Sequence, residues 1–184
     1  RHFDLAARIY DRLPPYGDEE LQQLLALRDG HRVLDVGGGT GRVLSAWRCR
    51  CLKVVLDASW DMGQRALRKG LPTSIALAEQ LPFADGTFDR LIMVDTFHHL
   101  DDQERAAREA VRVLAPGGVA VIEEPDIRLG AVRAVAMVER LLLMRSRFYS
   151  VDDMTRIFRR AGAQRMESWE DPPRVRLVVH RDRA

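Results

Sequence analysis

The chain has 184 residues, the size of one domain that can bury its own core. Hydrophobic residues make up 46% and charged residues 30%, which excludes a disordered, collagen-like or coiled-coil chain. The apolar runs are too short to span a membrane, and no signal-peptide pattern opens the chain, so we expect a cytoplasmic protein with no membrane span. We predict a single domain over 1–184, with cap helices within 1–30.

The net charge of +2 is unevenly distributed along the chain. Residues 1–126 carry 16 basic and 20 acidic side chains, whereas residues 127–184 carry 13 and 7. The C-terminal arginines are scattered, with few aromatic residues between them, which favours solvated arginines or an anionic small substrate over a nucleic-acid groove. The only cysteines, Cys49 and Cys51, are separated by one residue, which makes a bond between them awkward. We therefore expect free thiols and no metal site.

Strand-like and helix-like stretches alternate along the chain, as is typical of a mostly parallel sheet with helices on both faces. In chain order we expect a helix at 18–28, a strand at 32–36, a helix at 41–48, a strand at 52–57, a helix at 60–69, strands at 73–77 and 89–94, a helix at 101–114, a strand at 119–123, helices at 131–147 and 152–161, and strands at 164–169 and 175–180. A short loop at Pro172-Pro173 predicts that the last strand is antiparallel. The fold class is thus α/β, a doubly wound, Rossmann-like sheet of seven strands.

The segment from Val33 to Arg42 leads from an apolar strand through a glycine loop into a helix. Its spacing, Gly37, Gly39 and Gly41, differs from the dinucleotide fingerprint, which requires glycine where this chain has Arg42. Such a loop lets the backbone approach a ligand, and the helix that follows offers unpaired N–H groups. The pattern predicts a cofactor cradle, although a tight turn without a ligand has the same sequence.

An acidic residue ends the second predicted strand. Asp57 lies 20 residues after Gly37, where a carboxylate can accept hydrogen bonds from both hydroxyls of a ribose. Asp57 or Ser59 also fits the N-cap of the next helix, and the two interpretations are compatible.

Three more motifs follow in order: Ala78-Glu79-Gln80-Leu81-Pro82-Phe83, Asp95-Thr96-Phe97-His98-His99-Leu100 and Leu114-Ala115-Pro116-Gly117-Gly118. With the glycine loop, Asp57, Phe88-Asp89 and the opening segment 3–11, they resemble the class I S-adenosylmethionine-dependent methyltransferases. The similarity is greatest to the group that includes ubiquinone/menaquinone-biosynthesis C-methyltransferases. It covers residues 3–118 well and the rest more loosely.

The resemblance implies an enzyme that binds S-adenosyl-L-methionine and releases S-adenosyl-L-homocysteine. Its cofactor contacts, from the methionine end through ribose and adenine to the acceptor side, would be Asp35, Gly37, Gly39, Gly41, Asp57, Ala58, Met62, Ala78, Glu79, Asp95, Phe97 and Tyr10. One position departs from the family pattern, because Leu77 stands where an Asp usually meets the adenine amino group. Either Glu79 or a backbone carbonyl replaces that Asp, or adenine is held more weakly.

Transfer of a methyl group from a sulfonium requires alignment and a dry site rather than a metal. If the acceptor must lose a proton, His98 or His99 is the expected catalytic base, since α/β sites are built at the carboxyl ends of strands. Adjacent side chains usually point apart, so we expect at most one of the two to face the pocket.

We expect a small-molecule methyl acceptor, mostly apolar and phenol-like or quinol-like, with one acidic group. It would lie among Tyr10, Phe97, the two histidines and a lid helix at 131–147. The arginines that would meet its acidic group are Arg128, Arg133 or Arg145. Two other functions stay open: a non-catalytic S-adenosylmethionine-binding protein, and an NAD(P)-dependent oxidoreductase on a related sheet.

Overall fold

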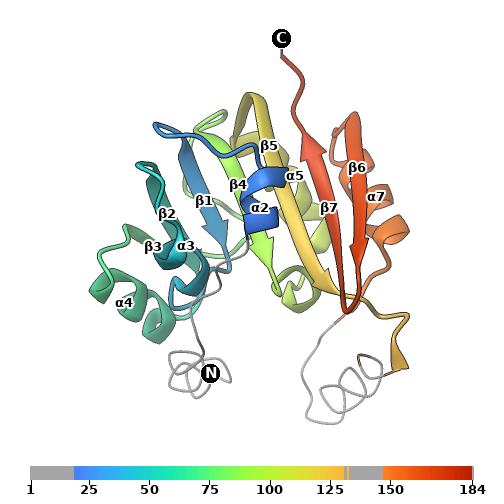
Figure 1. Ribbon diagram of the computed structural model, residues 1–184, viewed down its shortest axis with the longest axis horizontal. Coiled ribbons are helices and arrows are strands. Elements are labelled where there is room, and N and C mark those ends of the chain that lie inside the picture. The colour runs from blue at the N-terminus through green and yellow to red at the C-terminus, as the bar shows by residue number, and fades with distance from the viewer. Residues whose placement is uncertain (1–18, 131, 133–146, 184) are drawn as a thin grey trace.

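The computed structural model describes residues 19–130, 132 and 147–183, and its strands form one seven-stranded sheet (Figure 1). The strands are β1 (Arg32–Val36), β2 (Leu52–Asp57), β3 (Thr73–Ile75), β4 (Phe88–Val94), β5 (Leu114–Pro125), β6 (Arg165–Asp171) and β7 (Arg174–His180). Their order is β3-β2-β1-β4-β5-β7-β6. The first five pair in parallel, and β7 is antiparallel to both β5 and β6. The predicted fold class is confirmed.

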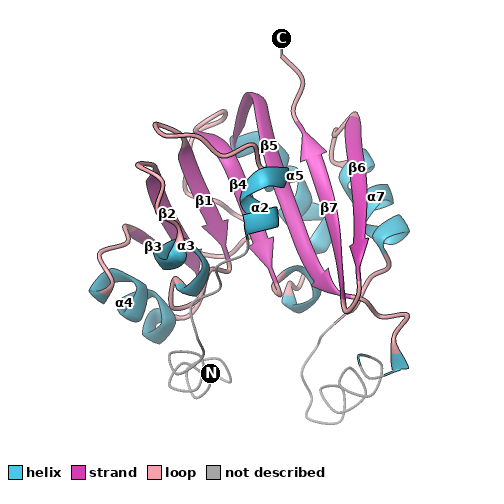
Figure 2. Cartoon of the chain, viewed as in Figure 1, coloured by secondary structure: helices cyan, strands magenta, loops and turns pink. Residues whose placement is uncertain are grey.

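Helices cover both faces of the sheet (Figure 2). The described helices are α2 (Glu19–Leu24), α3 (Arg42–Ala46), α4 (Trp60–Arg68), the 3-10 helix η1 (Phe97–His99), α5 (Gln103–Val113) and α7 (Val151–Arg160). Leu21 of α2 and Leu44 of α3 are buried against one face, whereas Ala107 of α5 and Phe158 of α7 are buried against the other. Most of the predicted lid helix at 131–147, and residues 1–18 of the predicted cap, lie outside the described residues.

Several predicted boundaries shift because local geometry overrides the sequence pattern. The helix predicted from residue 41 begins at Arg42, because Gly41 has a left-handed backbone with φ of 72°. The helix predicted from residue 101 begins at Gln103, because Asp102 is its N-cap and accepts a hydrogen bond from the backbone N–H of Arg105. The predicted strand at 119–123 extends over Leu114–Pro125, and it pairs with β4 through a register shift.

Alternation along β5 sends its two glutamates to opposite faces of the sheet. Val121 lies in the core under α2 and α3, and Ile122 lies in the core under α5 and α7. Glu123 and Glu124 continue that alternation, and both are fully or almost fully buried. Glu123 therefore faces α2, and Glu124 faces the layer that holds η1.

The prediction of free thiols is wrong. Cys49 and Cys51 form a disulfide in the bend between α3 and β2, where their Cα atoms lie 5.3 Å apart, within the usual range for such bonds. Among the described residues no group of three or more His, Cys, Asp or Glu side chains is arranged to hold a metal ion. A search of the same residues finds no helix long and apolar enough to cross a membrane.

Candidate active site

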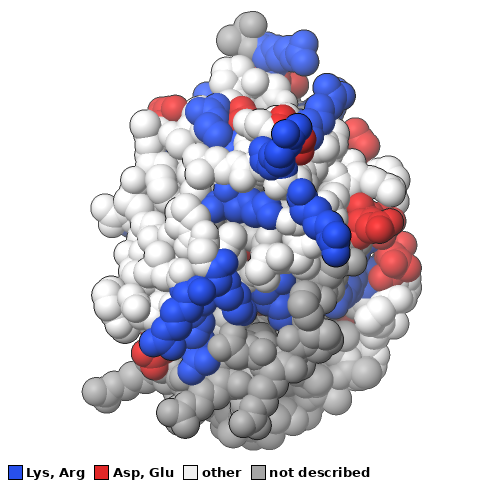
Figure 3. Space-filling view, turned by 60° about the vertical axis from the view of Figure 1, so that its left-hand side comes forward, with Lys and Arg blue, Asp and Glu red and all other residues white. Residues whose placement is uncertain are grey.

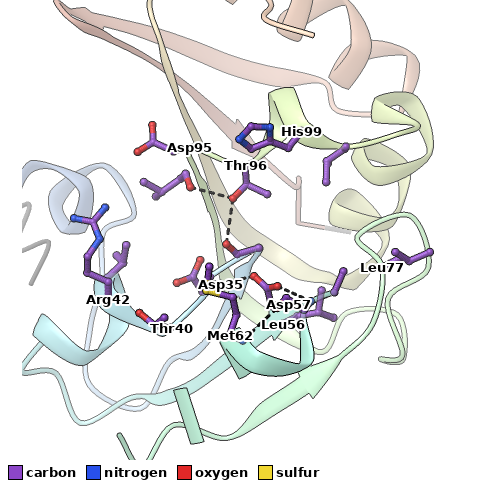
Figure 4. A pocket seen from close by; sticks show the side chains of 18 of the residues that line it. Asp35, Thr40, Arg42, Leu56, Asp57, Met62, Leu77, Asp95, Thr96 and His99 are labelled. Carbon is purple, nitrogen blue, oxygen red and sulfur yellow. Dashed lines mark hydrogen bonds between the residues drawn. The ribbon is translucent and has the colours of Figure 1, made fainter. Parts of the chain in front are cut away.

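A cavity of about 290 Å³ opens at the carboxyl ends of β1, β2 and β4 (Figure 4). The predicted site residues that line it are Asp35, Gly37, Gly39, Asp57, Ala58, Met62, Glu79, Asp95 and His99. In Figure 4, Asp95, Thr96 and His99 lie on one side of the cavity, and Thr40, Asp57 and Met62 lie on the other. The cavity therefore brings together residues from four separate sequence motifs.

The glycine loop needs glycine for two different reasons. At Gly37, where φ is 71°, a Cβ atom would overlap the side chain of Thr96. At Gly39, where φ is 56°, a Cβ atom would lie 3.7 Å from Sδ of Met62, in the space of the cavity itself. The first glycine lets the loop pack on the turn after β4, and the second leaves room for a ligand.

Asp57 holds the glycine loop and the start of α4 together. Its Oδ2 accepts a hydrogen bond from the backbone N–H of Gly39 at 2.9 Å, and its Oδ1 accepts one from the N–H of Ser59 at 2.8 Å. Ser59 is the true N-cap of α4, because its Oγ accepts from the N–H of Met62. A carboxylate can accept several hydrogen bonds, so this structural role of Asp57 is compatible with the predicted ribose role.

Asp35 is a buried carboxylate without a full set of partners. Its residue exposure is 1%, and its Oδ2 has no hydrogen-bond partner among the described residues. Burial, reinforced by the charge of Asp57, raises the pKa of Asp35 to about 8. A buried acid of this kind is stabilised by a cationic group placed in the cavity.

The turn after β4 presents Asp95 and His99 to the cavity. Asp95 has a left-handed backbone with φ of 50°, an unfavourable conformation of the sort that gathers at functional sites. Burial, followed by the charges of Glu124 and Glu123, raises the pKa of Asp95 to about 6. Burial, with the neighbouring His98 charge, lowers the pKa of His99 to about 3, so its imidazole is neutral at pH 7.

Four predicted site residues do not line the cavity. Ala78 and Phe97 are buried in the core on the α5 and α7 side. Gly41 is the N-cap residue of α3, and its left-handed backbone lets the chain enter that helix. His98 is 4% exposed and points to Glu124 instead of the cavity. Tyr10 lies outside the described residues.

The adenine end of the predicted site differs most from the family pattern. Leu77 is 59% exposed and lines the cavity where the sequence lacks the usual Asp. Oε1 of Glu79 accepts hydrogen bonds from the backbone N–H groups of Asp101 and Asp102, at 3.0 and 3.2 Å. Glu79 thus braces the loop before α5 at the edge of the cavity.

Sequence reasoning missed several residues that line the cavity, among them Thr40, Arg42, Thr96, Leu100 and Asp101. The sequence could have indicated Thr96, because this residue lies inside the motif that contains Asp95 and His99. Oγ1 of Thr96 donates to the backbone oxygens of Gly37 and Val94, and this choice of partners requires the three-dimensional structure.

The charge of the cavity is strongly negative. Five acidic side chains line it, those of Asp35, Asp57, Glu79, Asp95 and Asp101, and Arg42 is the one Lys or Arg among its described lining residues. Asp35, with a pKa of about 8, is mostly protonated at pH 7, and the other four acids still outnumber the arginine. The cavity is therefore electrostatically suited to a ligand with positive charge.

Comparisons with known proteins agree with this architecture. A family model described as "Methyltransferase domain" matches residues 34–122. An uncharacterised methyltransferase of Mycobacterium tuberculosis is 35% identical over 142 residues, which is 74% of this chain and 58% of that protein. A ubiquinone/menaquinone biosynthesis C-methyltransferase of Laribacter hongkongensis is 35% identical over 108 residues, 53% of this chain and 44% of that protein.

A solved structure shares the fold across nearly its whole length. It is an S-adenosylmethionine-dependent methyltransferase of Thermotoga maritima, with a TM-score of 0.80, 23% identity and 98% of each chain covered. The chain spans about half the length of the curated relatives it matches. The glycine loop, the strand order and the domain match at residues 34–122 make the chain similar to S-adenosylmethionine-dependent methyltransferases in sequence and in fold.

Proposed function

We propose that this chain transfers the methyl group of S-adenosyl-L-methionine to a small-molecule acceptor by in-line displacement. The observation that carries the proposal is the buried Asp35, whose Oδ2 has no hydrogen-bond partner in the described part of the chain, in a cavity lined by five acidic side chains and the glycine loop. S-adenosylmethionine carries a sulfonium and an ammonium, the positive groups that such a cavity favours.

The residues present fit this cofactor. Asp35 and the backbone of Gly37 and Gly39 would hold its methionine end, and Asp57 would accept from the ribose hydroxyls. Met62 is 4% exposed and lines the cavity close to Asp57, where its side chain suits an adenine face. When bound, the cofactor would supply an electrophilic methyl group.

The protein's part in the reaction is alignment, exclusion of water and, for an acidic acceptor, removal of a proton. A base acts best when its pKa is near the working pH, so Asp95, with a pKa of about 6, suits this role better than His99, with a pKa of about 3. Neutral His99 would instead accept a hydrogen bond from the acceptor.

The acceptor class stays a proposal. An apolar phenol or quinol fits the side of the cavity formed by Thr96, His99 and Leu100. The guanidinium of Arg128 is already bound by Asp126 and Glu170, at 2.8 and 2.9 Å, so it is a poor partner for an acidic group on the acceptor. Arg133 and Arg145 lie outside the described residues.

On the face in Figure 3, Lys and Arg side chains form separate groups divided by uncharged surface, which fits a small acceptor better than a nucleic acid.

Two measurements test the function. Calorimetry with S-adenosylhomocysteine should show binding and a rise in melting temperature, and NAD should give neither. Labelled methyl transfer from S-adenosylmethionine should then be screened against phenols, quinols and small amines. Binding without transfer to any of these would favour the non-catalytic alternative, and stabilisation by NAD alone would favour the oxidoreductase.

With an acceptor in hand, Asp95→Asn and His99→Ala separate the two candidate bases. We expect Asp95→Asn to remove the acidic limb of the pH–rate profile near pH 6, and His99→Ala to preserve it. If truncating His98 and His99 together leaves the turnover unchanged, neither histidine is the base.

A further inference from the structure

Glu124 has no assigned role, yet it makes three hydrogen bonds to a single turn. Its Oε1 accepts from the backbone N–H groups of Thr96 and Phe97, at 3.1 and 2.7 Å. Its Oε2 lies 2.5 Å from Nδ1 of His98. Glu124 is 2% exposed, so water does not compete for these bonds.

The turn that Glu124 holds forms a wall of the cavity. Asp95, Thr96, His99 and Leu100 all line the cavity, although Glu124 itself does not. Oγ1 of Thr96 also donates to the backbone oxygen of Gly37 at 3.2 Å, which joins this turn to the glycine loop. The carboxylate of Glu124, at the end of β5, thus holds the turn that contacts the glycine loop.

His98 extends the same support toward the cavity. Its ring stacks on Phe148, with ring centroids 4.4 Å apart and planes 17° apart, and its centroid lies 3.8 Å from that of His99. Its backbone oxygen accepts from the N–H of Arg147 at 2.7 Å. The side chain of His98 therefore links Glu124 to the imidazole that does face the cavity.

Because Asp95 has a left-handed backbone, the turn does not rest in a conformation that its residues prefer. Something must hold it, and a buried carboxylate that accepts from two successive backbone N–H groups supplies that restraint. A shorter side chain would not reach all three groups, and glutamine keeps its bond to His98 only if the imidazole changes tautomer.

We propose that Glu124 is a positioning residue of this site: through His98 and through the amides of Thr96 and Phe97, it fixes the turn that presents Asp95 and His99 to the bound cofactor and acceptor. This role rests on the proposed function. Glu124 touches neither ligand, and its effect reaches them only through the turn.

The test compares Glu124→Gln and Glu124→Ala with Glu123→Gln, using S-adenosylhomocysteine as the probe. Glu123 is a matched control, because it is as buried as its neighbour but binds Arg174 and Arg176 on the opposite face of the sheet. We expect the dissociation constant to rise about tenfold in Glu124→Ala and about threefold in Glu124→Gln. In Glu123→Gln it should change less than about twofold, even though its melting temperature falls.

A second readout follows the link to His98 directly. Gln offers one acceptor and one NH₂ donor, so if its oxygen stays with the two amides, its NH₂ faces Nδ1 of His98. Nitrogen NMR of the imidazole should then show Nδ1 without its proton in Glu124→Gln, and with its proton in the wild type and in Glu123→Gln. This measurement needs only the folded isosteric variant, should Glu124→Ala fail to fold.

The outcomes separate the two proposals. A wild-type chain that does not bind S-adenosylhomocysteine overturns the proposed function. A wild type that binds, with Glu124→Gln unchanged both in affinity and in the His98 nitrogen signals, overturns the role of Glu124 alone. An equal loss of affinity in Glu123→Gln also overturns it, because that result reports general destabilisation.

Discussion

Two groups of buried carboxylates in this molecule differ in how they are neutralised. On the α2 face, Glu123 binds Arg174 and Arg176, and Arg176 also binds Glu20. At the cavity, Asp35 has an unpaired oxygen, and the pKa values of Asp35 and Asp95 are both raised. Glu123 is thus paired within the protein, whereas the acids at the cavity would gain stabilisation from a ligand with positive charge.

The contrast teaches that burial of an acid does not by itself mark a site. Glu123 is more buried than Asp57, yet its charge is balanced by two arginines. What distinguishes the cavity is that its acids outnumber the one arginine among its described lining residues. The four variants below test this distinction.

The largest change in the free energy of unfolding should come from the group in which Glu123 is paired with arginines. Arg176→Leu leaves the buried Glu123 with one arginine and should lower the free energy of unfolding by about 3 kcal/mol, because half-broken buried pairs are costly. Urea unfolding measures this loss, and Arg50→Leu, in an exposed pair with Asp29, should lower the free energy of unfolding far less. S-adenosylhomocysteine affinity should not change; a large loss in folded Arg176→Leu would mean that this network supports the site as well.

Asp35→Asn should act in the opposite direction on stability. The native pKa of Asp35 is about 8, above its unfolded value of 3.8, so the native state holds a proton more tightly than the unfolded state. The resulting stability is fully present below pH 4 and is lost as the pH rises through about 8. The stability of Asp35→Asn relative to wild type should therefore increase from pH 5 to pH 9.

Urea unfolding at pH 5, 7 and 9, without cofactor, measures this difference. The same variant should bind S-adenosylmethionine more weakly, because the carboxylate that faces the positive charge is gone. Parallel pH curves for the two proteins would contradict the assignment of Asp35 as an uncompensated acid.

Asp57→Ala should weaken S-adenosylhomocysteine binding by roughly 1–3 kcal/mol, since it removes an acceptor for the ribose and releases the N–H of Gly39. Calorimetry measures the affinity. Asp89→Ala is the control, because Asp89 binds Arg32 away from the cavity and should leave the affinity as it is. If a folded Asp57→Ala protein binds S-adenosylhomocysteine as tightly as wild type, Asp57 has a structural role only.

The smallest effect concerns the contact between the two walls. Thr96→Val keeps the shape of the side chain and removes its hydrogen bond to the backbone oxygen of Gly37, which should weaken S-adenosylhomocysteine binding by about 1 kcal/mol. Thr87→Val, which loses a bond to the backbone oxygen of Ala84 and does not line the cavity, is the control. Equal affinities of wild type and Thr96→Val would show that packing alone holds the glycine loop against the turn.

Much of the fold was predictable because it depends on patterns among residues that are neighbours in the sequence. The bounds predicted for β1 and β2 agree with the structure, since each is an apolar run that ends at a turn. Where an observed helix boundary differs from the predicted one, a single backbone conformation accounts for the difference, as at Gly41 before α3. The disulfide between Cys49 and Cys51 depends on the shape of one bend, which residue types alone do not specify.

By itself, the sequence determined the resemblance to methyltransferases, the glycine loop and the acids at the strand ends, because each is encoded in neighbouring residues whose geometry a strand and a turn prescribe. Only the tertiary structure decided which histidine faces the cavity. It turns His98 toward Glu124, 26 residues away along the chain, and leaves His99 at the cavity wall. It likewise separated Glu123 from Glu124, adjacent residues with the same side chain, because the pleat of β5 sends one to the arginines and the other to the turn beside the cavity.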